Sequence, residues 1–444
     1  MNQLELDILK ARESRQEILG GSDGIKVITS LNVPGKPKIN ENINNIARDV
    51  TEDVLLFLEG VLAVEGFLYQ VEDAAGYYAL ISFREDIGFD ARFVKELCEI
   101  LEKFHPIGRL IDLDVYDELG DRVSSGRVKS CFVCGENAKL CIRGQKHTVE
   151  EARMAFDELL LEYLEKAEEE GLADYLALSA LTAMIAEVAL DPKPGLVTRK
   201  VVGIHKDMNF DLFVKSALAI VPGFRIIALK ATEIENLYQF REIGLQMELW
   251  MFNATKGINT HKGMIFVLGL VVWAVALSFE EYSDLDRDFV SESIKQITKG
   301  VTNELKYSLD THGGQVFNKY RLTGVRGEVE AGLPSVFEHG FEQLFRHLPI
   351  VLEDEEEVAP YSEAYKAALV AIIANSEDTN VVYRSGLESL GLLQNKAKEI
   401  LEIDVWDYEA EKKYGELCLF CEENNVSCGG AADLLAVAIF LSLF

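Results

Sequence analysis

The chain has 444 residues, of which 48% are hydrophobic and 27% are charged, and its formal net charge is −30 at pH 7. This composition predicts a globular protein with two or three domains and excludes a disordered chain. The negative charge argues against nucleic acid and anionic membranes as partners, so a polyanionic ligand would need local clusters of Lys, Arg and helix N-termini.

The first residues, MNQLELDILKARESRQ, predict a charged amphipathic helix and lack the features of a signal peptide. We therefore expect a cytoplasmic protein. Its seven cysteines indicate reduced thiols or metal ligands rather than disulfides. An uncharged run at residues 263–279 is at the lower length limit for a membrane span and has no basic flank, so we expect a buried helix and no membrane contact.

The two halves of the chain differ in their patterns. Strand-like pieces lie between residues 25 and 120, namely IKVITSLNV, YYALISF and RLIDLDVYD. From Thr148, which forms a capping box with Glu151, long helical patterns take over, and Gly171 stands where the first of them is expected to end. We predict an α+β N-terminal domain over residues 1–170 and a larger all-α C-terminal domain over residues 171–444.

Two aspartates lie in the strand-like piece IDLDV. Its alternation places Asp112 and Asp114 on one face and the apolar residues on the other. Two carboxylates at this spacing form a compact site for a divalent metal such as Mg²⁺, of the kind that bridges a triphosphate in nucleotidyl transfer. A strand that turns its polar face to water explains the same pattern, so both interpretations stay open.

A group of metal-binding residue types follows at Cys131, Cys134, Cys141 and His147. They are candidates for a Cys₃His zinc site. The second pair lacks the usual spacing of a zinc motif, and cysteine is also a common small core residue, so the zinc and core interpretations both remain. Residues 121–150 carry six Lys or Arg against three Asp or Glu, which suits an anionic ligand or an acidic partner protein.

Four pieces of this first half resemble the holo-citrate lyase synthase family, also called apo-citrate lyase phosphoribosyl-dephospho-CoA transferase, over about residues 1–168. They are ARESRQ (11–16), SLNVPGKPK (30–38), PIGRLIDLDV (106–115) and CFVCGENAKLCIRGQKH (131–147). The resemblance implies transfer of a modified CoA from a triphosphoribosyl donor to a serine of the acyl carrier protein (gamma) subunit of citrate lyase, with release of pyrophosphate. The phosphate and Mg²⁺ ligands that it implies are Arg12, Arg15, Arg109, Asp112 and Asp114.

The second half contains short polar clusters, each placed where a loop meets an apolar helix. They are DPKPGLVTRKVVGIHKDM (191–208), ATKGINTHKG (254–263), TGVRGEVEAGLP (323–334), NSEDTNVVYRSG (375–386) and NNVSCGGAADLLA (424–436). Helix N-termini bind phosphate through unpaired N–H groups and the helix dipole, so converging loops of this kind would form a polyphosphate site. Turn chemistry explains each cluster alone, but it does not explain all of them together.

The sequences of these clusters and their order along the chain resemble the triphosphoribosyl-dephospho-CoA synthase family, from about residue 172 to the end. The resemblance implies an all-α enzyme that joins ATP to 3′-dephospho-CoA, releases adenine and leaves a 5″-triphosphoribosyl group on the 2′-hydroxyl of the CoA ribose. The chain departs from the family at residues 427–431, where it has SCGGA in place of Ser-Pro-Gly-Gly-Ser. We therefore assign no role to the side chains of Cys428 and Ala431.

Attack of an alcohol on the ribose C1′ of ATP needs a base, carboxylates near the developing positive charge and a clamp for the triphosphate. We expect Asp207 to bind the metal, and Glu328 to act as base or to stabilise the cation, with His261 or His205 beside it. The expected ligands of ATP and dephospho-CoA are Lys193, Arg199, Gly257, Asn259, Thr260, Lys262, Gly263, Arg326, Asp378, Asn380, Arg384, Gly429, Gly430 and Asp433.

The product implied for the second half is the donor implied for the first. We therefore interpret the chain as a bifunctional transferase that makes and attaches the prosthetic group of citrate lyase, with ATP and 3′-dephospho-CoA as substrates. Two alternatives remain. One is a metal-dependent ADP-ribose or nucleotide hydrolase with a regulatory N-terminal module, and the other is a non-catalytic carrier-protein adaptor that uses the basic residues 121–150.

Overall fold

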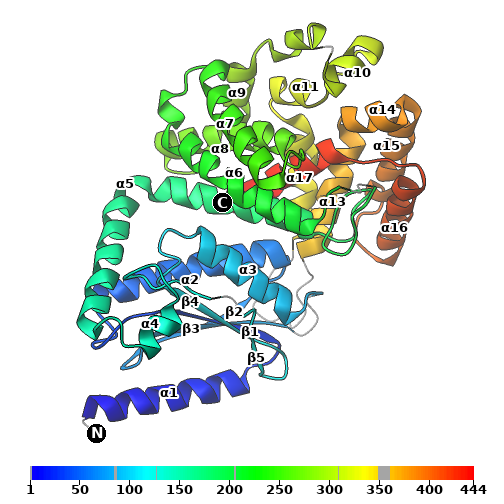
Figure 1. Cartoon of the computed structure of the whole chain (residues 1–444). Coiled ribbons are helices and arrows are strands. Elements are labelled where there is room, and N and C mark those ends of the chain that lie inside the picture. Colours follow the sequence, from blue (N-terminus) through cyan, green and yellow to red (C-terminus); the bar gives the residue numbers. More distant parts are fainter. Residues whose placement is uncertain (1–2, 85–87, 127, 205–206, 309, 349–360) are drawn as a thin grey trace. The chain divides into compact units, whose positions relative to one another are not determined.

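The computed structural model describes residues 3–84, 88–126, 128–204, 207–308, 310–348 and 361–444. The chain divides into two compact units, Met1–Gly171 and Leu172–Phe444 (Figure 1). The first unit contains both helices and a sheet. In the second, the described residues form helices and loops without a strand, which is consistent with the expected α+β and all-α classes.

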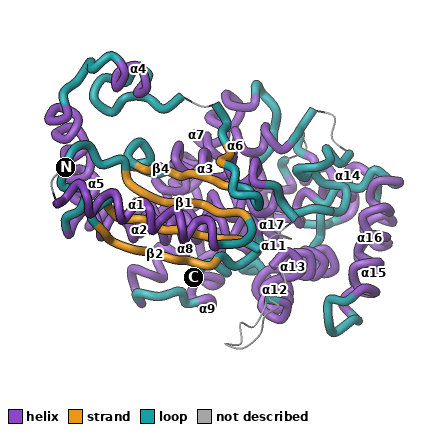
Figure 2. Tube along the Cα trace, turned by 90° about the horizontal axis from the view of Figure 1, so that it is seen from below, coloured by secondary structure: helices purple, strands orange, loops and turns teal. Residues whose placement is uncertain are grey.

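The N-terminal unit is built on an antiparallel sheet in the order β2-β3-β1-β4-β5 (Figure 2). The strands are β1 (Ile25–Leu31), β2 (Phe67–Asp73), β3 (Gly76–Phe83), β4 (Ile111–Tyr116) and β5 (Arg122–Val123). The helices that lie within this unit are α1 (Gln3–Gly21), α2 (Glu41–Leu62), α3 (Ala91–Phe104) and α4 (Ala138–Arg143). Helices α2 and α3 pack on one face of the sheet, and α1 lies on the other side (Figure 1).

Alternation along β4 produces the two-faced strand that the sequence predicts. Ile111, Leu113 and Val115 are fully buried beneath the helices, whereas Asp112 and Asp114 are only half-buried. In the β1–β4 register Ser30 lies opposite Asp112. The face of the sheet that is opposite α2 and α3 therefore carries the two aspartates.

The helix that begins at the capping box is longer than expected. Thr148 N donates to Glu151 Oε2 at 2.8 Å and Glu151 N donates to Thr148 Oγ1 at 3.1 Å, so the capping box is present. The expected end at Gly171 is wrong, because α5 runs from Val149 to Ala189. A glycine inside a helix costs about 1 kcal/mol relative to alanine, and burial of the following residues, such as Leu176 and Leu181, outweighs this cost.

The C-terminal unit is a set of helices around the buried helices α8 and α17. Its α-helices beyond α5 are α6 (Phe210–Leu229), α7 (Leu237–Thr255), α8 (Lys262–Tyr282), α9 (Arg287–Thr298), α10 (His312–Tyr320), α11 (Gly324–Glu330), α12 (Phe341–His347), α13 (Tyr361–Asn375), α14 (Thr379–Ser385), α15 (Leu387–Leu401), α16 (Tyr408–Glu423) and α17 (Gly429–Leu441). Two short 3₁₀ helices are η1 (Ala231–Glu233) and η2 (Val301–Lys306), and η3 (Ser335–Gly340) is a short π-helix.

Three helical segments are long and apolar enough to cross a bilayer, judged by length and composition: Glu169–Ala189, Phe210–Leu229 and Lys262–Tyr282. The apolar stretches of the first and third are 83% and 72% buried inside the protein, against 39% for the second. Helix α8 packs against α6, α7, α9 and α17. The uncharged run at residues 263–279 is therefore part of the core of the helical unit, as expected.

Candidate active sites

A cavity of about 800 Å³ lies in the C-terminal unit where α8, α10, α11, α14 and α17 begin. Every one of the polar clusters expected from the sequence contributes residues to its wall, although they span residues 191–436 of the chain. The expected site residues that line it are Lys193, Asn259, Thr260, His261, Lys262, Gly263, Arg326, Glu328, Asp378, Asn380, Arg384, Gly429, Gly430 and Asp433. The volume falls within the range of small-molecule sites.

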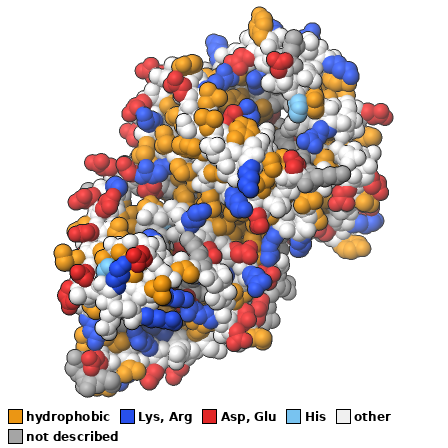
Figure 3. Space-filling view, in the orientation of Figure 1, with side chains coloured by type: hydrophobic (Ala, Val, Ile, Leu, Met, Phe, Trp, Pro, Cys, Tyr) orange, Lys and Arg blue, Asp and Glu red, His pale blue; other side chains and the backbone are white. Residues whose placement is uncertain are grey.

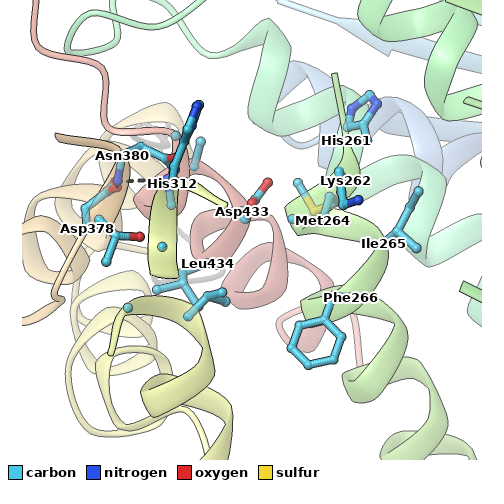
Figure 4. A pocket seen from close by; sticks show the side chains of 18 of the residues that line it. His261, Lys262, Met264, Ile265, Phe266, His312, Asp378, Asn380, Asp433 and Leu434 are labelled. Carbon is cyan, nitrogen blue, oxygen red and sulfur yellow. Dashed lines mark hydrogen bonds between the residues drawn. The ribbon is translucent and has the colours of Figure 1, made fainter. Parts of the chain in front are cut away.

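Asp433 of α17 faces the start of α8 across this cavity (Figure 4). A Cβ atom on Gly263 would lie 2.0 Å from Asp433 Oδ2, so any other residue at this position of α8 would displace the Asp433 carboxyl group. Burial, and then the nearby charges of Glu187 and Asp378, raise the pKa of Asp433 well above its usual value. These surroundings favour a carboxyl group that can hold a proton.

Glu187 lies beside a buried lysine in the same cavity. Lys193 Nζ donates to Glu187 Oε1 at 2.5 Å and to the Glu187 carbonyl oxygen at 2.7 Å, and both side chains are almost fully buried. The sequence reasoning missed Glu187. A signal for it exists, because it is the one charged residue in the apolar stretch at residues 176–190.

His261 occupies the N-cap position of α8, where its side chain makes no capping hydrogen bond, and it is 2% exposed. A hydrogen bond of 2.7 Å joins its Nδ1 atom to Ser216 Oγ, and Thr260 Oγ1 donates to the same oxygen at 2.6 Å. Burial, and then the charge of Lys193, lower the pKa of His261 to about 3. The imidazole is therefore neutral at physiological pH, and its contacts position the N-terminus of α8.

The carboxylate of Asp378 accepts hydrogen bonds from the N-termini of two helices, α14 and α17. Its Oδ1 atom accepts from Asn380 N, which lies beside it in Figure 4, at 2.9 Å. Its Oδ2 atom accepts from Gly430 N at 2.9 Å and from Ala431 N at 3.2 Å. A carboxylate at a helix N-terminus satisfies donors that otherwise have no partner. Asp378 therefore holds α14 against α17 at the cavity wall.

Three cations of the cavity lie beside acidic side chains. Lys262 Nζ lies 2.8 Å from Glu248 Oε2. Arg241 forms two hydrogen bonds to Glu304, of 2.8 and 2.9 Å, and Arg326 lies 3.9 Å from the same carboxylate. The sequence reasoning missed Arg241, Glu248 and Glu304, because α7 and η2 carry no motif.

Glu328 and His312 complete the wall. The backbone N–H of Ser335 donates to Glu328 Oε1 at 2.7 Å, and burial raises the pKa of this carboxyl group. His312, at the start of α10, stacks on Tyr383 with 3.7 Å between ring centroids and was also missed from the sequence.

Several expected residues lie elsewhere. Asp207 and Gly257 are exposed, Arg199 is half-buried, and these three do not line the cavity. His205 lies outside the described residues.

A smaller cavity of about 120 Å³ lies in the N-terminal unit, lined by Arg12, Arg15, Ser30 and Lys38 among others. Arg15 pairs with Asp73 at 2.5 Å, and its guanidinium lies over the Tyr78 ring. Burial, followed by the charges of Arg12, Arg153 and Lys36, lowers the pKa of Lys38. Lys and Arg side chains gather on this unit in the face that Figure 3 shows, although the chain as a whole is acidic.

The aspartates of β4 lie one strand away from this basic cavity, opposite Ser30 and its neighbours on β1. Lys129 Nζ lies 2.8 Å from Asp112 Oδ1 and also 2.8 Å from Glu102 Oε1, and Asp114 is bonded to Arg122. Arg109 is half-buried in the turn before β4 and does not line the cavity.

The expected metal-binding group is also assembled in this unit. The ligand atoms of Cys131, Cys134, Cys141 and His147 all lie within 4.8 Å of one another.

Comparison with known proteins identifies both units. Residues 173–444 match the family model described as ATP:dephospho-CoA triphosphoribosyl transferase. The chain belongs to this family. Residues 4–163 match the model described as apo-citrate lyase phosphoribosyl-dephospho-CoA transferase. The two matches follow the order expected from the sequence, so the resemblance of both halves is confirmed.

Relatives that contain both parts align with almost the whole chain. Protein CitXG of Haemophilus influenzae is 33% identical, over 98% of this chain and 95% of that protein. Protein CitXG of Leuconostoc mesenteroides subsp. cremoris is 30% identical, over 98% and 96% respectively. The 2-(5″-triphosphoribosyl)-3′-dephosphocoenzyme-A synthase of Haemophilus ducreyi is 35% identical, over 69% of this chain and 98% of that protein. The chain is thus a bifunctional transferase, and neither the hydrolase nor the adaptor alternative is supported.

Proposed function

We propose that the cavity of the C-terminal unit joins ATP to 3′-dephospho-CoA. The bond between ribose C1′ and the adenine nitrogen of ATP breaks, and a bond forms between C1′ and the 2′-oxygen of dephospho-CoA. Adenine leaves with the electron pair of the broken bond. The proton that the 2′-hydroxyl loses balances the negative charge that adenine carries away. The observation that carries this assignment is the convergence of all the polar clusters on one cavity.

The triphosphate is assigned to the side of the cavity where Lys262, Arg241 and Arg326 lie. These cations pair with Glu248 and Glu304 in the present structure, so the phosphates of a bound nucleotide would replace carboxylates as their partners. Helix α8, with 21 residues, adds the positive end of its dipole at Lys262. Charge-assisted contacts of this kind hold the triphosphate, which stays on the ribose, and so position C1′ for attack while adenine leaves.

Asp433 is our candidate for the acceptor of the hydroxyl proton. Its raised pKa suits a group that takes a proton and returns it, and Gly263 leaves it directly against the start of α8. Glu328 is assigned to the positive charge that develops at ribose C1′, because it lines the same cavity and the Ser335 backbone holds it in place.

Magnesium is the metal that the triphosphate chemistry implies. The carboxylate oxygens of Glu187, Glu248 and Glu304 are ligands of the class that Mg²⁺ prefers, so the cavity fits this ion by its chemistry. When bound, Mg²⁺ would supply positive charge that offsets the charge of the phosphates.

The N-terminal unit is proposed to attach the product to a serine of the citrate lyase acyl carrier subunit. The serine oxygen attacks the phosphorus nearest the ribose, the bond to the next bridging oxygen breaks, and pyrophosphate leaves as the serine loses its proton. Arg12, Arg15 and Lys38 provide the phosphate site, and Asp112 and Asp114 are the Mg²⁺ candidates beside it. This reaction between the triphosphoribosyl donor and the acyl carrier subunit is expected to take place in the cytoplasm.

The test of the first reaction is an incubation of purified protein with ATP, dephospho-CoA or both, with adenine measured by chromatography. We expect adenine only when both substrates are present, and a ribosylated dephospho-CoA of matching mass. Adenine or ribose phosphates from ATP alone would support hydrolysis instead. Arg326→Ala should lower kcat/KM roughly 100-fold, while Arg346→Ala, on the exposed end of α12, should not change it.

A further inference from the structure

We propose that Cys131, Cys134, Cys141 and His147 bind one zinc ion that holds the end of the N-terminal unit together. In a tetrahedral site with Zn–S bonds of about 2.3 Å, neighbouring sulfurs lie about 3.8 Å apart. The Sγ atoms of Cys134 and Cys141 are 3.6 Å apart, and all four ligand atoms lie within 4.8 Å of one another. Three thiolates and one imidazole are a common zinc ligand set.

The backbone of the first pair is folded to present both sulfurs on one side. Gly135 has a φ of +75°, and its N–H donates to the Cys131 carbonyl oxygen at 2.7 Å. Cys131 N also donates to the Glu136 carbonyl oxygen at 2.5 Å. Two backbone hydrogen bonds therefore close the turn that carries Cys131 and Cys134.

The second pair comes from α4 and the turn after it. Asn137 caps α4 by accepting from Lys139 N at 3.0 Å, and Lys146 N donates to the Cys141 carbonyl oxygen at 3.0 Å. This turn places His147 beside the cysteines. Its Nε2 atom is buried and has no hydrogen-bond partner. A buried polar atom without a partner is costly, and a metal ion at this position would satisfy it.

The interpretation of these cysteines as core residues does not fit their surroundings. Cys134 is exposed, and in α4 only Cys141 is buried, while Leu140 and Ile142 are 64% and 76% exposed. A helix of six residues is not stable by itself, and this one has little apolar packing to hold it. A metal cross-link provides the missing stabilisation, as it does in small metal-dependent domains.

A disulfide between Cys134 and Cys141 would need a sulfur–sulfur bond of about 2.05 Å, shorter than the observed 3.6 Å. Zinc binding involves no oxidation or reduction. The ion takes up three thiolates and the neutral imidazole of His147, and each thiol releases its proton to solvent.

The zinc site also bears on the proposed transferase site. Lys129 lies two residues before Cys131, and its Nζ contacts both Asp112 and Glu102. The ion would fix the segment that carries Lys129 and so position this lysine on the aspartates. This link to carrier modification rests on the proposed function, whereas zinc binding itself does not.

The first test is metal analysis of protein purified without chelators. We expect about one equivalent of zinc, and loss of that zinc in Cys141→Ser and His147→Ala. Cys98→Ala removes a buried cysteine of the same unit that lies outside the cluster, and it should keep the zinc. Replacement of zinc by cobalt should give the intense visible absorption of a tetrahedral cobalt–thiolate centre, which reports the ligands directly and does not depend on activity.

The second test follows the two reactions after zinc is removed from the wild-type protein. Hydrogen exchange should increase in residues 128–147, and carrier modification should fall, while adenine release should stay unchanged because its residues lie in the C-terminal unit. Protein with neither zinc nor cobalt binding, or with a Cys134–Cys141 disulfide in mass spectrometry, would overturn the proposal. Bound zinc together with absent carrier modification would contradict the proposed function and leave the zinc site intact.

Discussion

Asp433 and Asp207 are both acidic residues of expected motifs, but only Asp433 lies in the cavity. Asp433→Asn keeps the size of the side chain and removes the carboxylate that we assign to the hydroxyl proton. We expect adenine release to fall by roughly two orders of magnitude or more, with unchanged circular dichroism. Asp207→Asn should keep the wild-type rate. A normal rate of adenine release in Asp433→Asn, or a large loss in Asp207→Asn, would contradict the assignment of Asp433. The essential acidic residue would then be placed in residues 191–208.

The low pKa of His261 predicts how the free energy of unfolding depends on pH. Its pKa is about 3 in the folded protein, so the unfolded chain binds a proton below pH 6.5 that the folded chain does not bind. This contribution to stability is present above pH 6.5 and is lost as the pH falls towards 3. Between about pH 7.5 and 5.5, the wild type should lose about 1.4 kcal/mol of unfolding free energy that His261→Asn does not lose.

Chemical denaturation of both proteins at the two pH values measures this difference. His339→Asn, which changes a histidine outside the cavity, should follow the wild type. An equal loss in wild type and His261→Asn would mean that the imidazole titrates normally, and that it remains available as a base near neutral pH.

Motif residues of the cavity could be predicted because loops that start helices have a recognisable composition. Lys262, Gly263 and Asp433 lie near the start of the helices that follow such loops. Arg241 and Glu304 lie inside helical segments, and only the packing of α7 beside η2 and α11 brings them to Arg326. A single sequence does not contain that information. Asp378 shows the opposite case, since its type and position fitted a ligand but its oxygens are used by helix N-termini.

At the scale of secondary structure, the sequence predicted the strands and helices with buried apolar residues, but it did not predict an exposed strand. Strands β1, β3 and β4 have clear apolar residues on their buried face, whereas β2 is mostly exposed and lies at the edge of the sheet. Its sequence FLYQVED therefore shows no burial pattern. The long apolar helix α8 was recognised because burial on all sides leaves a run without charges.

Helix α5 gives a prediction for Gly171. This residue lies inside the helix, and a Cβ atom added to it would have no other atom within 4 Å, so alanine fits there. Gly171→Ala should raise the free energy of unfolding by about 0.5–1 kcal/mol, because alanine restricts the unfolded chain and favours the helix. Gly120→Ala is the matched control, since Gly120 also has open space but a φ of +83°, and it should lose stability. A loss in Gly171→Ala would mean that the helix ends there.

At the scale of the whole molecule, the two reactions are assigned to separate compact units. Each unit has its own cavity with its own cations, on a chain whose net charge is −30. Because anionic substrates are repelled by the overall charge, binding depends on these local basic groups and should weaken as salt screens them.

The division into two units predicts that the reactions can be separated by mutation. Asp112→Asn and Asp114→Asn each keep the size and hydrogen bonding of the side chain but remove the charge that a metal ion needs. Carrier modification should fall by orders of magnitude, whereas adenine release should stay nearly unchanged. The triphosphoribosyl intermediate should then accumulate in solution.

Mass spectrometry of the carrier protein and chromatography of adenine measure both outcomes in one reaction. Asp23→Asn, an exposed aspartate just before β1, is the control for loss of a negative charge in the same unit. Normal carrier modification in both variants would mean that Asp112 and Asp114 only form the polar face of β4 with Lys129 and Arg122. Equal loss of both activities would contradict the assignment of the two reactions to separate units, since the residues of the adenine-releasing cavity lie between Glu187 and Leu434, far along the chain from the substituted strand.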